Sequence, residues 1–288
     1  MALPRLGAIE TLFNRRLKPV IARGDTAALS ALTGLRELHL RDTYLPDPCR
    51  LTALPRLEAL TFTDVEIAIV NFADSLGELR CLTRLHVHCV TLDDCDCFDD
   101  ETCAVPLVKR ATTLRALSVR PSDSDDVHVG NHDTSDLTSC LPMLTYLDLN
   151  SNDINSTGTC GLTGLRNLAH LDLSYNDICD AGAAALTCLT ALTELCLSTN
   201  RIGTLGVKAL ASLTDLVYLD VSDNVEIDDE GALALAGTTH LTTLCVSRQG
   251  FKEHGTAALM ATLRGELPYL YGIGNMLYGR INYDLGPW

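Results

Sequence analysis

Residues 144–154 read LTYLDLNSNDI, and the same pattern returns as LAHLDLSYNDI at 168–178, LTELCLSTNRI at 192–202 and LVYLDVSDNVEI at 216–227. Each copy starts 24 residues after the one before it. Within a copy, apolar and polar residues alternate over a short stretch, which is the pattern of a β-strand with one buried face. A repeat of this period predicts a solenoid, in which each unit stacks only on its neighbours.

Each of these copies continues in register beyond its strand. An asparagine follows, and its amide can satisfy backbone groups where the chain turns sharply; the four are Asn152, Asn176, Asn200 and Asn224. The pattern Ile-x-[Ser/Asp/Thr]-x-Gly comes next and predicts helices with these N-caps: Ser156, Asp180, Thr204 and Asp229. Each unit is therefore strand, turn, helix and return, and the crossover rule for parallel strands predicts right-handed coiling.

Weaker copies lie on both sides of this core. The pattern L-x-x-L-x-L, with Val or Phe allowed in the last place, also begins at Leu35, Leu57, Leu82, Leu114 and Leu241, and a degenerate copy starts at Leu267. The four N-terminal copies lack the glycine and carry other residues where asparagine is expected, namely Thr43, Val65, Val90 and Ser122. Their connecting segments are therefore expected to be irregular, and two of them contain insertions at 86–103 and 120–136.

In these motifs the chain resembles the leucine-rich repeat family, specifically the helix-bearing type with ribonuclease-inhibitor-like and GALA-like repeats. The resemblance covers about residues 35–266. It implies an α/β fold, a right-handed solenoid shaped as a horseshoe or arc, with parallel strands on the concave face and helices on the convex face. It also implies four regions: a capping helix at 1–34, irregular repeats at 35–143, regular repeats at 144–266 and a cap or tail at 267–288.

The two ends differ from the repeats in composition. The first 34 residues place Leu6, Ile9, Phe13, Leu17 and Val20 at helical spacing, which predicts an amphipathic capping helix that stops near Pro19. This segment is also basic, so a mitochondrial presequence is the alternative. The tail is rich in aromatic residues that either seal the core or anchor a partner; they are Tyr269, Tyr271, Tyr278, Tyr283 and Trp288.

The insertion at 86–103 is the one place where metal chemistry is conceivable. It brings together His86, His88, Cys89, Cys95, Cys97 and Cys103. Zinc uses such ligands, but no C-x-x-C pair is present and both histidines fall on strand positions. An acidic surface loop is therefore the preferred interpretation, and no metal or other cofactor is expected. The sequence also has no nucleophile elbow, phosphate loop, metalloprotease helix or dinucleotide fingerprint, so an enzyme is not expected.

In a leucine-rich repeat, the third, fifth and seventh places of each copy point out of the concave surface. An N-terminal basic end and a C-terminal acidic, aromatic end are expected there and could orient a partner protein. The candidate partner-binding residues are Arg84, His86, His88, Arg120, Tyr146, Asp148, His170, Asp172, Glu194, Tyr218 and Asp220. The serines of the seventh place are either contacts or merely solvated.

Composition and net charge limit the classes of function that the chain can have. The formal net charge of −15 disfavours direct binding of nucleic acid. No apolar run is long enough to span a membrane, and the twelve cysteines read as reduced thiols. We therefore expect a non-catalytic protein-binding scaffold, monomeric within a larger assembly and cytoplasmic, with a cytoskeletal or ciliary setting as one possibility. The alternatives are a substrate-recognition module of a ubiquitin ligase and a regulator that inhibits a partner enzyme.

Overall fold

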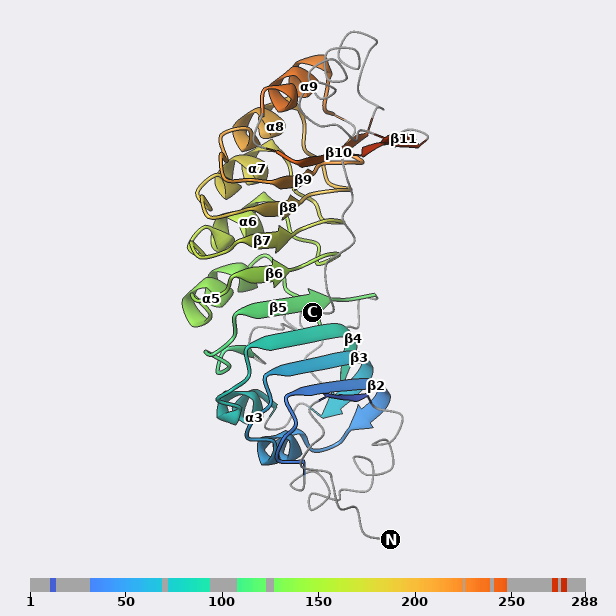
Figure 1. The fold of residues 1–288 in the computed structure, drawn as a ribbon, viewed down its shortest axis with the longest axis vertical. Coiled ribbons are helices and arrows are strands. Elements are labelled where there is room, and N and C mark those ends of the chain that lie inside the picture. The colour runs from blue at the N-terminus through green and yellow to red at the C-terminus, as the bar shows by residue number, and fades with distance from the viewer. Residues whose placement is uncertain are drawn as a thin grey trace. The chain divides into compact units, whose positions relative to one another are not determined.

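The structure is a computed structural model of residues 1–288. It describes residues 11–13, 32–68, 72–93, 108–122, 127–224, 226–238, 241–247, 271–273 and 276–278. The chain divides into two compact units, residues 1–152 and residues 153–288. Each is a stack of strand-and-helix repeats (Figure 1).

Unit 1 is a parallel sheet whose strands follow chain order. Its strands are β1 (Thr11–Phe13), β2 (Glu37–Leu45), β3 (Ala59–Ala68), β4 (Arg84–Asp93), β5 (Ala116–Arg120) and β6 (Tyr146–Asp148). The connections contain the 3-10 helix η3 (Pro48–Ala53) and the α-helices α3 (Phe72–Glu78) and α5 (Asp133–Cys140). Strands β2 to β4 have nine or ten residues, much longer than the three of β6, so these copies are irregular as expected.

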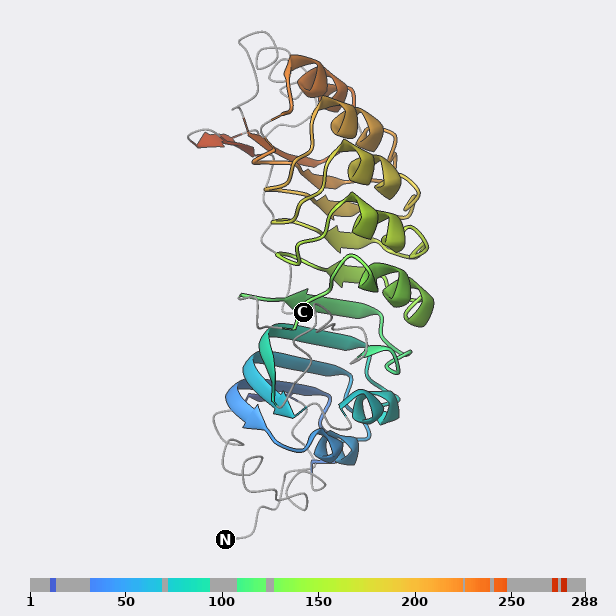
Figure 2. The same ribbon diagram turned by 180° about the vertical axis from the view of Figure 1, so that it is seen from behind.

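Unit 2 contains the regular repeats. Its parallel strands are β7 (His170–Asp172), β8 (Glu194–Cys196), β9 (Tyr218–Asp220) and β10 (Thr243–Ser247). Its helices are α6 (Ser156–Leu162), α7 (Asp180–Leu186), α8 (Thr204–Leu210) and α9 (Asp229–Ala236). In both views these helices lie together on one side of the strands (Figures 1 and 2). We call the opposite side, which carries the third, fifth and seventh places, the open strand face.

The period of the leucines explains this arrangement. Leu192, Leu195 and Leu197 of one repeat and Ile202 of its turn are all fully buried. Equivalent residues of the neighbouring repeats are buried as well, because parallel pairing sets Leu171 beside Leu195 and Leu195 beside Leu219. A continuous apolar core therefore runs through the repeats, and the predicted α/β solenoid is confirmed within each unit.

The predicted asparagine ladder is present in the structure. Asn200 is typical: its Oδ1 accepts the backbone N–H of Ile178 at 2.9 Å, and its Nδ2 donates to the carbonyl of Leu173 at 2.9 Å. Both partners belong to the preceding repeat. Asn224 makes the equivalent bonds to Ile202 and Leu197, at 2.9 Å and 2.8 Å. Each asparagine therefore joins two repeats and replaces backbone pairing where the strand ends.

The helix-start prediction is correct in place but off by one residue. The N-caps are Asn155, Cys179, Gly203 and Asp228, so the four predicted caps are instead the first residues of their helices. Three of them act on the next repeat. Asp180 accepts the N–H groups of Gly203 and Gly206 at 2.7 Å and 2.8 Å, Ser156 accepts that of Gly182, and Thr204 bonds to Asp228. These hydrogen bonds between repeats stabilise the stack in addition to the packing of the apolar cores.

The ends depart from the prediction. Thr11–Phe13 form strand β1, which pairs parallel with β2, so the expected capping helix is wrong at Phe13; the rest of 1–31 lies outside the described residues. A strand here satisfies the backbone edge of β2, which a helix would leave unpaired. At the other end, β12 (Met276–Tyr278) pairs antiparallel with β10, and β11 (Tyr271–Ile273) pairs antiparallel with β12. The copy at Leu267 is therefore not a tenth parallel repeat.

Candidate functional site

The strand register aligns the predicted columns within each unit. In unit 2 the third places run His170, Glu194, Tyr218 and Thr243, and the fifth places run Asp172, Cys196, Asp220 and Cys245. In unit 1, Arg84 lies beside Ala116 and then Tyr146, and His86 beside Ser118 and then Asp148. Because neighbouring strands lie about 4.8 Å apart, side chains in one column are close enough to interact.

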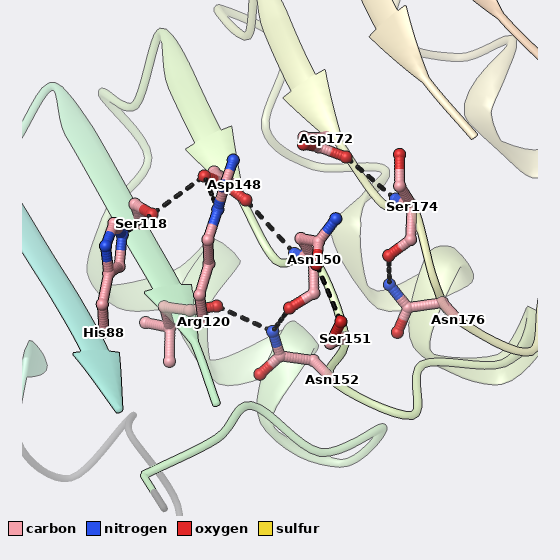
Figure 3. Close-up of polar contacts among 11 residues, drawn as sticks. His88, Ser118, Arg120, Asp148, Asn150, Ser151, Asn152, Asp172, Ser174 and Asn176 are labelled. Atoms are coloured by element: carbon pink, nitrogen blue, oxygen red, sulfur yellow. Dashed lines mark hydrogen bonds and ion pairs between the residues drawn. The ribbon is translucent and has the colours of Figure 1, made fainter. Parts of the chain in front are cut away.

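A polar network crosses β4, β5 and β6 in unit 1 (Figure 3). Asp148, only 2% exposed, accepts the Nε–H of Arg120 at 2.6 Å and the hydroxyl of Ser118 at 2.9 Å through Oδ2. Its other oxygen accepts the backbone N–H of Asn150 at 3.2 Å. His88 Nε2 lies 2.8 Å from Ser118 Oγ. Asp148 was expected on the surface facing a partner; in the structure it is buried, and Arg120 of the same chain pairs with its carboxylate.

The order of these contacts shows what the network can do. Ser118 has one hydroxyl proton, and it is given to Asp148, so His88 must donate its Nε2–H to the serine oxygen. A serine nucleophile needs the opposite arrangement, in which the histidine accepts the serine proton. Ser118 is also only 1% exposed. The network therefore stabilises three strands and does not activate a nucleophile.

The basic end expected in unit 1 is neutralised within the chain. Arg84 pairs with Glu37 at 2.7 Å, and Arg120 pairs with Asp148 at 2.6 Å. Arg41 lies 3.6 Å from both Asp42 and Asp64. The sequence shows three arginines on this face, but each has a carboxylate partner on its own strand, on the neighbouring strand or, for Arg84, two strands away.

The histidines of this face are not cationic at neutral pH. Burial, followed by the nearby His88, Arg84, His39 and Arg120, lowers the pKa of His86 to about 4. Burial, followed by Arg120, also lowers the pKa of His88 to about 4. The two imidazole rings lie edge to face, 6.0 Å apart. They therefore contribute neutral hydrogen-bonding groups and ring surface.

Unit 2 keeps the acidic character that the sequence predicts. His170 Nδ1 lies 2.9 Å from the carboxylate of Glu194. Asp172 and Asp220 each accept the backbone N–H two residues later, from Ser174 and Ser222, both at 2.9 Å (Figure 3 shows the first). Burial raises the pKa of Asp220, and Asp172 and Asp223 also act to raise it. The columns of β7 to β10 contain no lysine or arginine.

Two thiols and a phenol lie among these carboxylates. Burial raises the pKa of Cys196, and the charges of Asp172 and Asp220 raise it further. Burial and Asp220 likewise raise the pKa of Cys245 to about 12. The pKa of Tyr218 is raised by burial and by the neighbouring cysteines, and its hydroxyl lies 3.9 Å from Cys245 Sγ. All three groups are therefore neutral.

Tyr175, which the sequence reasoning missed, is the most exposed aromatic side chain described, at 60%. It occupies the eighth place, directly after the open strand face of β7. Its φ is 57°, a left-handed conformation shared by the eighth places Ser151, Thr199 and Asp223. A bulky side chain is uncommon in this conformation. The turn therefore holds a large ring out in solvent at the rim of the open strand face.

The seventh-place serines of unit 2 are not simply solvated. Ser174, Ser222 and Ser247 are 5–6% exposed. Ser222 donates to Asp220 at 2.6 Å, and Ser247 donates to Asp223 at 2.9 Å. These serines therefore position the acidic side chains beside them.

Several predicted residues lie where the structure is not described. Residues 94–107 are among them, so Cys95, Cys97 and Cys103 cannot be placed beside His86 and His88. No metal-binding group of His, Cys, Asp or Glu occurs among the described residues. Tyr269, Tyr283 and Trp288 also lie outside, and for Tyr271 and Tyr278 the structure describes the backbone only. In the described part of the chain, no helix is long and apolar enough to cross a membrane.

A shallow hollow of about 490 Å³ lies on unit 1, beyond the left-handed turns of its long strands. Its lining includes Asp42, Asp64, Glu66, Tyr44 and Cys89. It is wide open to solvent and lies beside Arg41, which pairs with two of these carboxylates. It does not enclose a small molecule as a catalytic pocket would.

These features are those of a leucine-rich repeat fold. Residues 142–202 and 212–236 match two leucine-rich repeat family models. Among solved structures, the chain is similar to internalin C2 from Listeria monocytogenes, with 21% identity, a TM-score of 0.55, and coverage of 84% of this chain and 96% of that one. A second internalin from the same organism has 20% identity, a TM-score of 0.46, and coverage of 80% and 79%. A search of curated proteins finds no match. The likeness concerns the fold, and the repeat subtype stays a prediction.

Proposed function

We propose that the protein is a non-catalytic scaffold that binds a partner protein through the open strand face of unit 2. The observation that carries this proposal is the difference between the two units. In unit 1 the arginines of the open strand face are paired with the chain's own carboxylates. In unit 2, Asp172, Glu194 and Asp220 share their columns with one histidine and no lysine or arginine. An acidic face with exposed aromatic surface is suited to a partner of opposite charge.

The geometry supports binding rather than catalysis. The hydrogen-bond order at Ser118 is unsuited to a nucleophile, and the raised pKa values of Cys196 and Cys245 keep these thiols protonated. The hollow described on unit 1 is wide open to solvent and lies away from these thiols. Leucine-rich repeats present an extended surface of strands, which is a geometry for recognising another macromolecule.

The proposal extends to the setting of the protein. We take it to act as one subunit of a larger assembly in a reducing compartment such as the cytoplasm. This is supported by the nine described cysteines, all of which are free thiols. Recognition of substrates for a ubiquitin ligase and inhibition of a partner enzyme would use the same surface and are distinguished by the partner's identity.

Affinity purification with mass spectrometry tests the proposal. The wild type is compared with Asp172→Ala/Tyr218→Ala and with a matched control, Leu205→Ala/Asp215→Ala. Both control residues are exposed and lie outside the strand columns. The proposal expects a defined set of partners to disappear only from the first variant, with all three proteins folded by circular dichroism. Partners that persist in that variant would show that binding uses another surface.

A further inference from the structure

Strands β2, β3 and β4 of unit 1 place three rows of side chains across the open strand face. In the row of third places, Glu37 on β2 and Arg84 on β4 lie on either side of Ala59 on β3. Arg84 Nη2 donates to Glu37 Oε1 at 2.7 Å, although β3 lies between their strands. Side chains of β2 and β4 therefore meet above the small residues of β3.

The row of fifth places has the same arrangement but no acid on these three strands. His39 on β2 and His86 on β4 lie on either side of Thr61 on β3. The two histidines interact across Thr61, because a charge on His39 lowers the pKa of His86. His88 follows on the same face of β4, and its ring lies 6.0 Å from that of His86. We call these four residues, His39, Thr61, His86 and His88, the histidine patch.

The electrostatic potential at the histidine patch is positive. Burial lowers the pKa of His86 to about 4, and every charge that contributes to this shift, from His88, Arg84, His39 and Arg120, acts in the same direction. Burial and then Arg120 lower the pKa of His88 to about 4. The arginines therefore still repel protons from these rings, although each arginine is paired with a carboxylate.

The other charged and titratable groups of this face only partly offset that potential. For His39, burial lowers the pKa, Glu37 raises it and Arg84 lowers it. The third, fifth and seventh places of β2 to β6 otherwise carry Glu37, Arg41, Arg84, Arg120, Tyr146 and Asp148, and the left-handed residues that come next on β2, β3 and β4 are Asp42, Asp64 and Cys89. Of these carboxylates, Glu37 pairs with Arg84, Asp148 with Arg120, and Asp42 and Asp64 with Arg41.

Hydrogen-bond donors at the patch lack acceptors. His86 and Thr61 make no hydrogen bond with the described part of the chain. The Nε–H of Arg84 is buried and also has no partner there. A buried polar group without a partner is uncommon and calls for an explanation, such as a bound ligand. An anionic acceptor above Thr61 would receive hydrogen bonds from Thr61 and His86 and would interact favourably with Arg84.

The open strand face of unit 2 shows how this face pairs histidine. His170 Nδ1 lies 2.9 Å from the carboxylate of Glu194, which has the same place on the adjacent strand. For His86, the same places on the adjacent strands are occupied by Thr61 and Ser118 instead. A carboxylate in the equivalent position beside His86 therefore has to come from another molecule.

We propose that the histidine patch binds a glutamate or aspartate side chain, above Thr61 and between His39 and His86, from an acidic segment of another protein. This site is separate from the acidic face of unit 2 and goes beyond the proposed function. The carboxylate takes the position that an acid would need to bridge the row of fifth places, as the pair of Glu37 and Arg84 bridges the row of third places.

Binding at this site is linked to protonation. At neutral pH the histidines are uncharged, whereas a bound carboxylate favours the protonated imidazole, so binding takes up a proton and tightens as the pH falls. When binding returns the pKa of His86 from about 4 to its ordinary value of about 6.5, the affinity rises about tenfold between pH 7.5 and pH 5.5. The carboxylate of the partner stays ionised over this range.

A defined peptide tests the proposal. Gly-Glu-Gly-Glu-Gly with blocked ends is titrated into the full chain at pH 7.5 and at pH 5.5, at constant low salt, beside a peptide in which glutamine replaces glutamate. The imidazole signals in NMR spectra measure the affinity and the pKa of each histidine, and circular dichroism checks the fold at both pH values. We expect the glutamate peptide to bind about tenfold more tightly at pH 5.5 and to raise the pKa of His86, and the glutamine peptide to do neither.

Two variants and a control locate the binding. His86→Gln removes the titrating group and should reduce the effect of pH to less than about threefold. Thr61→Val keeps the shape of the side chain, removes its hydroxyl and should weaken binding at pH 5.5 at least about threefold. The matched control His132→Gln removes a histidine at the exposed N-cap of α5, outside the open strand face, and should keep the tenfold effect.

An undiminished effect of pH in His86→Gln would show a general response to the falling negative charge of the protein and would overturn the proposal. Equal loss in His132→Gln, absence of measurable binding, or a pKa of His86 that the glutamate peptide leaves unchanged would also overturn it. None of these results bears on unit 2, for which partner capture by Asp172→Ala/Tyr218→Ala is a separate test.

Discussion

Replacing Asn200 by alanine removes a side chain that joins two repeats. Its Oδ1 is the partner of the Ile178 backbone N–H, at 2.9 Å. Its Nδ2 donates to the carbonyls of Leu173, Leu197 and Ser198, at 2.9–3.2 Å. The side chain is only 8% exposed, so water cannot easily take over these bonds.

The expected loss follows from which groups keep another partner. The carbonyls of Leu173 and Leu197 still accept from the neighbouring amides of Asn176 and Asn224. The N–H of Ile178 loses its bond, and an unsatisfied buried group costs about 1–3 kcal/mol. With some loss at the carbonyls, we expect the free energy of unfolding to fall by about 2–3 kcal/mol.

Asn200→Asp separates hydrogen bonding from packing. It keeps the shape and the acceptor for Ile178, but it turns an oxygen toward three carbonyl groups. At pH 7 it should destabilise at least as much as alanine, because the new charge is buried among acceptors. At pH 4 part of the loss should be recovered, since the protonated acid can donate to one carbonyl. Asn167→Asp, at an exposed position, is the control.

Urea unfolding followed by circular dichroism measures the overall effect, and amide hydrogen exchange at Ile178 measures the local one. We expect faster exchange at Ile178 in both Asn200 variants. An alanine variant within about 0.5 kcal/mol of the wild type, with unchanged exchange at Ile178, would refute the role assigned to the ladder.

Three further predictions concern packing, pH and thiols. Gly206→Ala should lower the free energy of unfolding by about 1–2 kcal/mol, because the added Cβ would lie 2.6 Å from Asp180 Oδ1 and from Ile202 Cγ2. In the same urea assay, Gly237→Ala should be nearly neutral, because its Cβ would make no contact under 3.4 Å. The free energy of unfolding should fall by about 1–3 kcal/mol as the pH drops from 6.5 to 4, because the unfolded chain protonates His86 and His88 before the folded protein does. A His86→Gln/His88→Gln variant whose stability falls just as much over this pH range would contradict the prediction. Iodoacetamide should modify Cys179 faster than Cys196 or Cys245, since a hydrogen bond from Ser156 lowers the pKa of this exposed thiol. Mass spectrometry measures the extent of modification at each cysteine, and the reverse order would show the assigned environments to be wrong.

The repeat itself could be predicted because equivalent residues have the same structural role in every copy. The leucines at the first, fourth and sixth places must be buried in every copy, so they set the strand register as well as the fold. Asn200 and its equivalents are predictable for the same reason, since each lies at the same position of its repeat, where the chain turns away from the strand. Register also gave the columns of the open strand face correctly within each unit.

What escaped prediction depends on contacts between repeats or on backbone conformation. Arg120 and Asp148 are 28 residues apart, and only the strand register brings the seventh place of one copy to the fifth place of the next. The sequence pattern contains that signal only when the fifth and seventh places of successive copies are compared with each other. Tyr175 was missed because its exposure follows from a left-handed turn. Phe13 was misassigned because the helical spacing of apolar residues does not reveal the unpaired edge of β2.

Site-specific photo-crosslinking tests the central claim, that the open strand face of unit 2 recognises a partner. A photoreactive phenylalanine analogue replaces Tyr175, at the rim of that face, or Leu205, on helix α8; these side chains are 60% and 70% exposed. The claim predicts that purified complexes yield crosslinks to the partner from position 175 and none from position 205. Crosslinks from position 205 alone would contradict it and would assign recognition to the helix side.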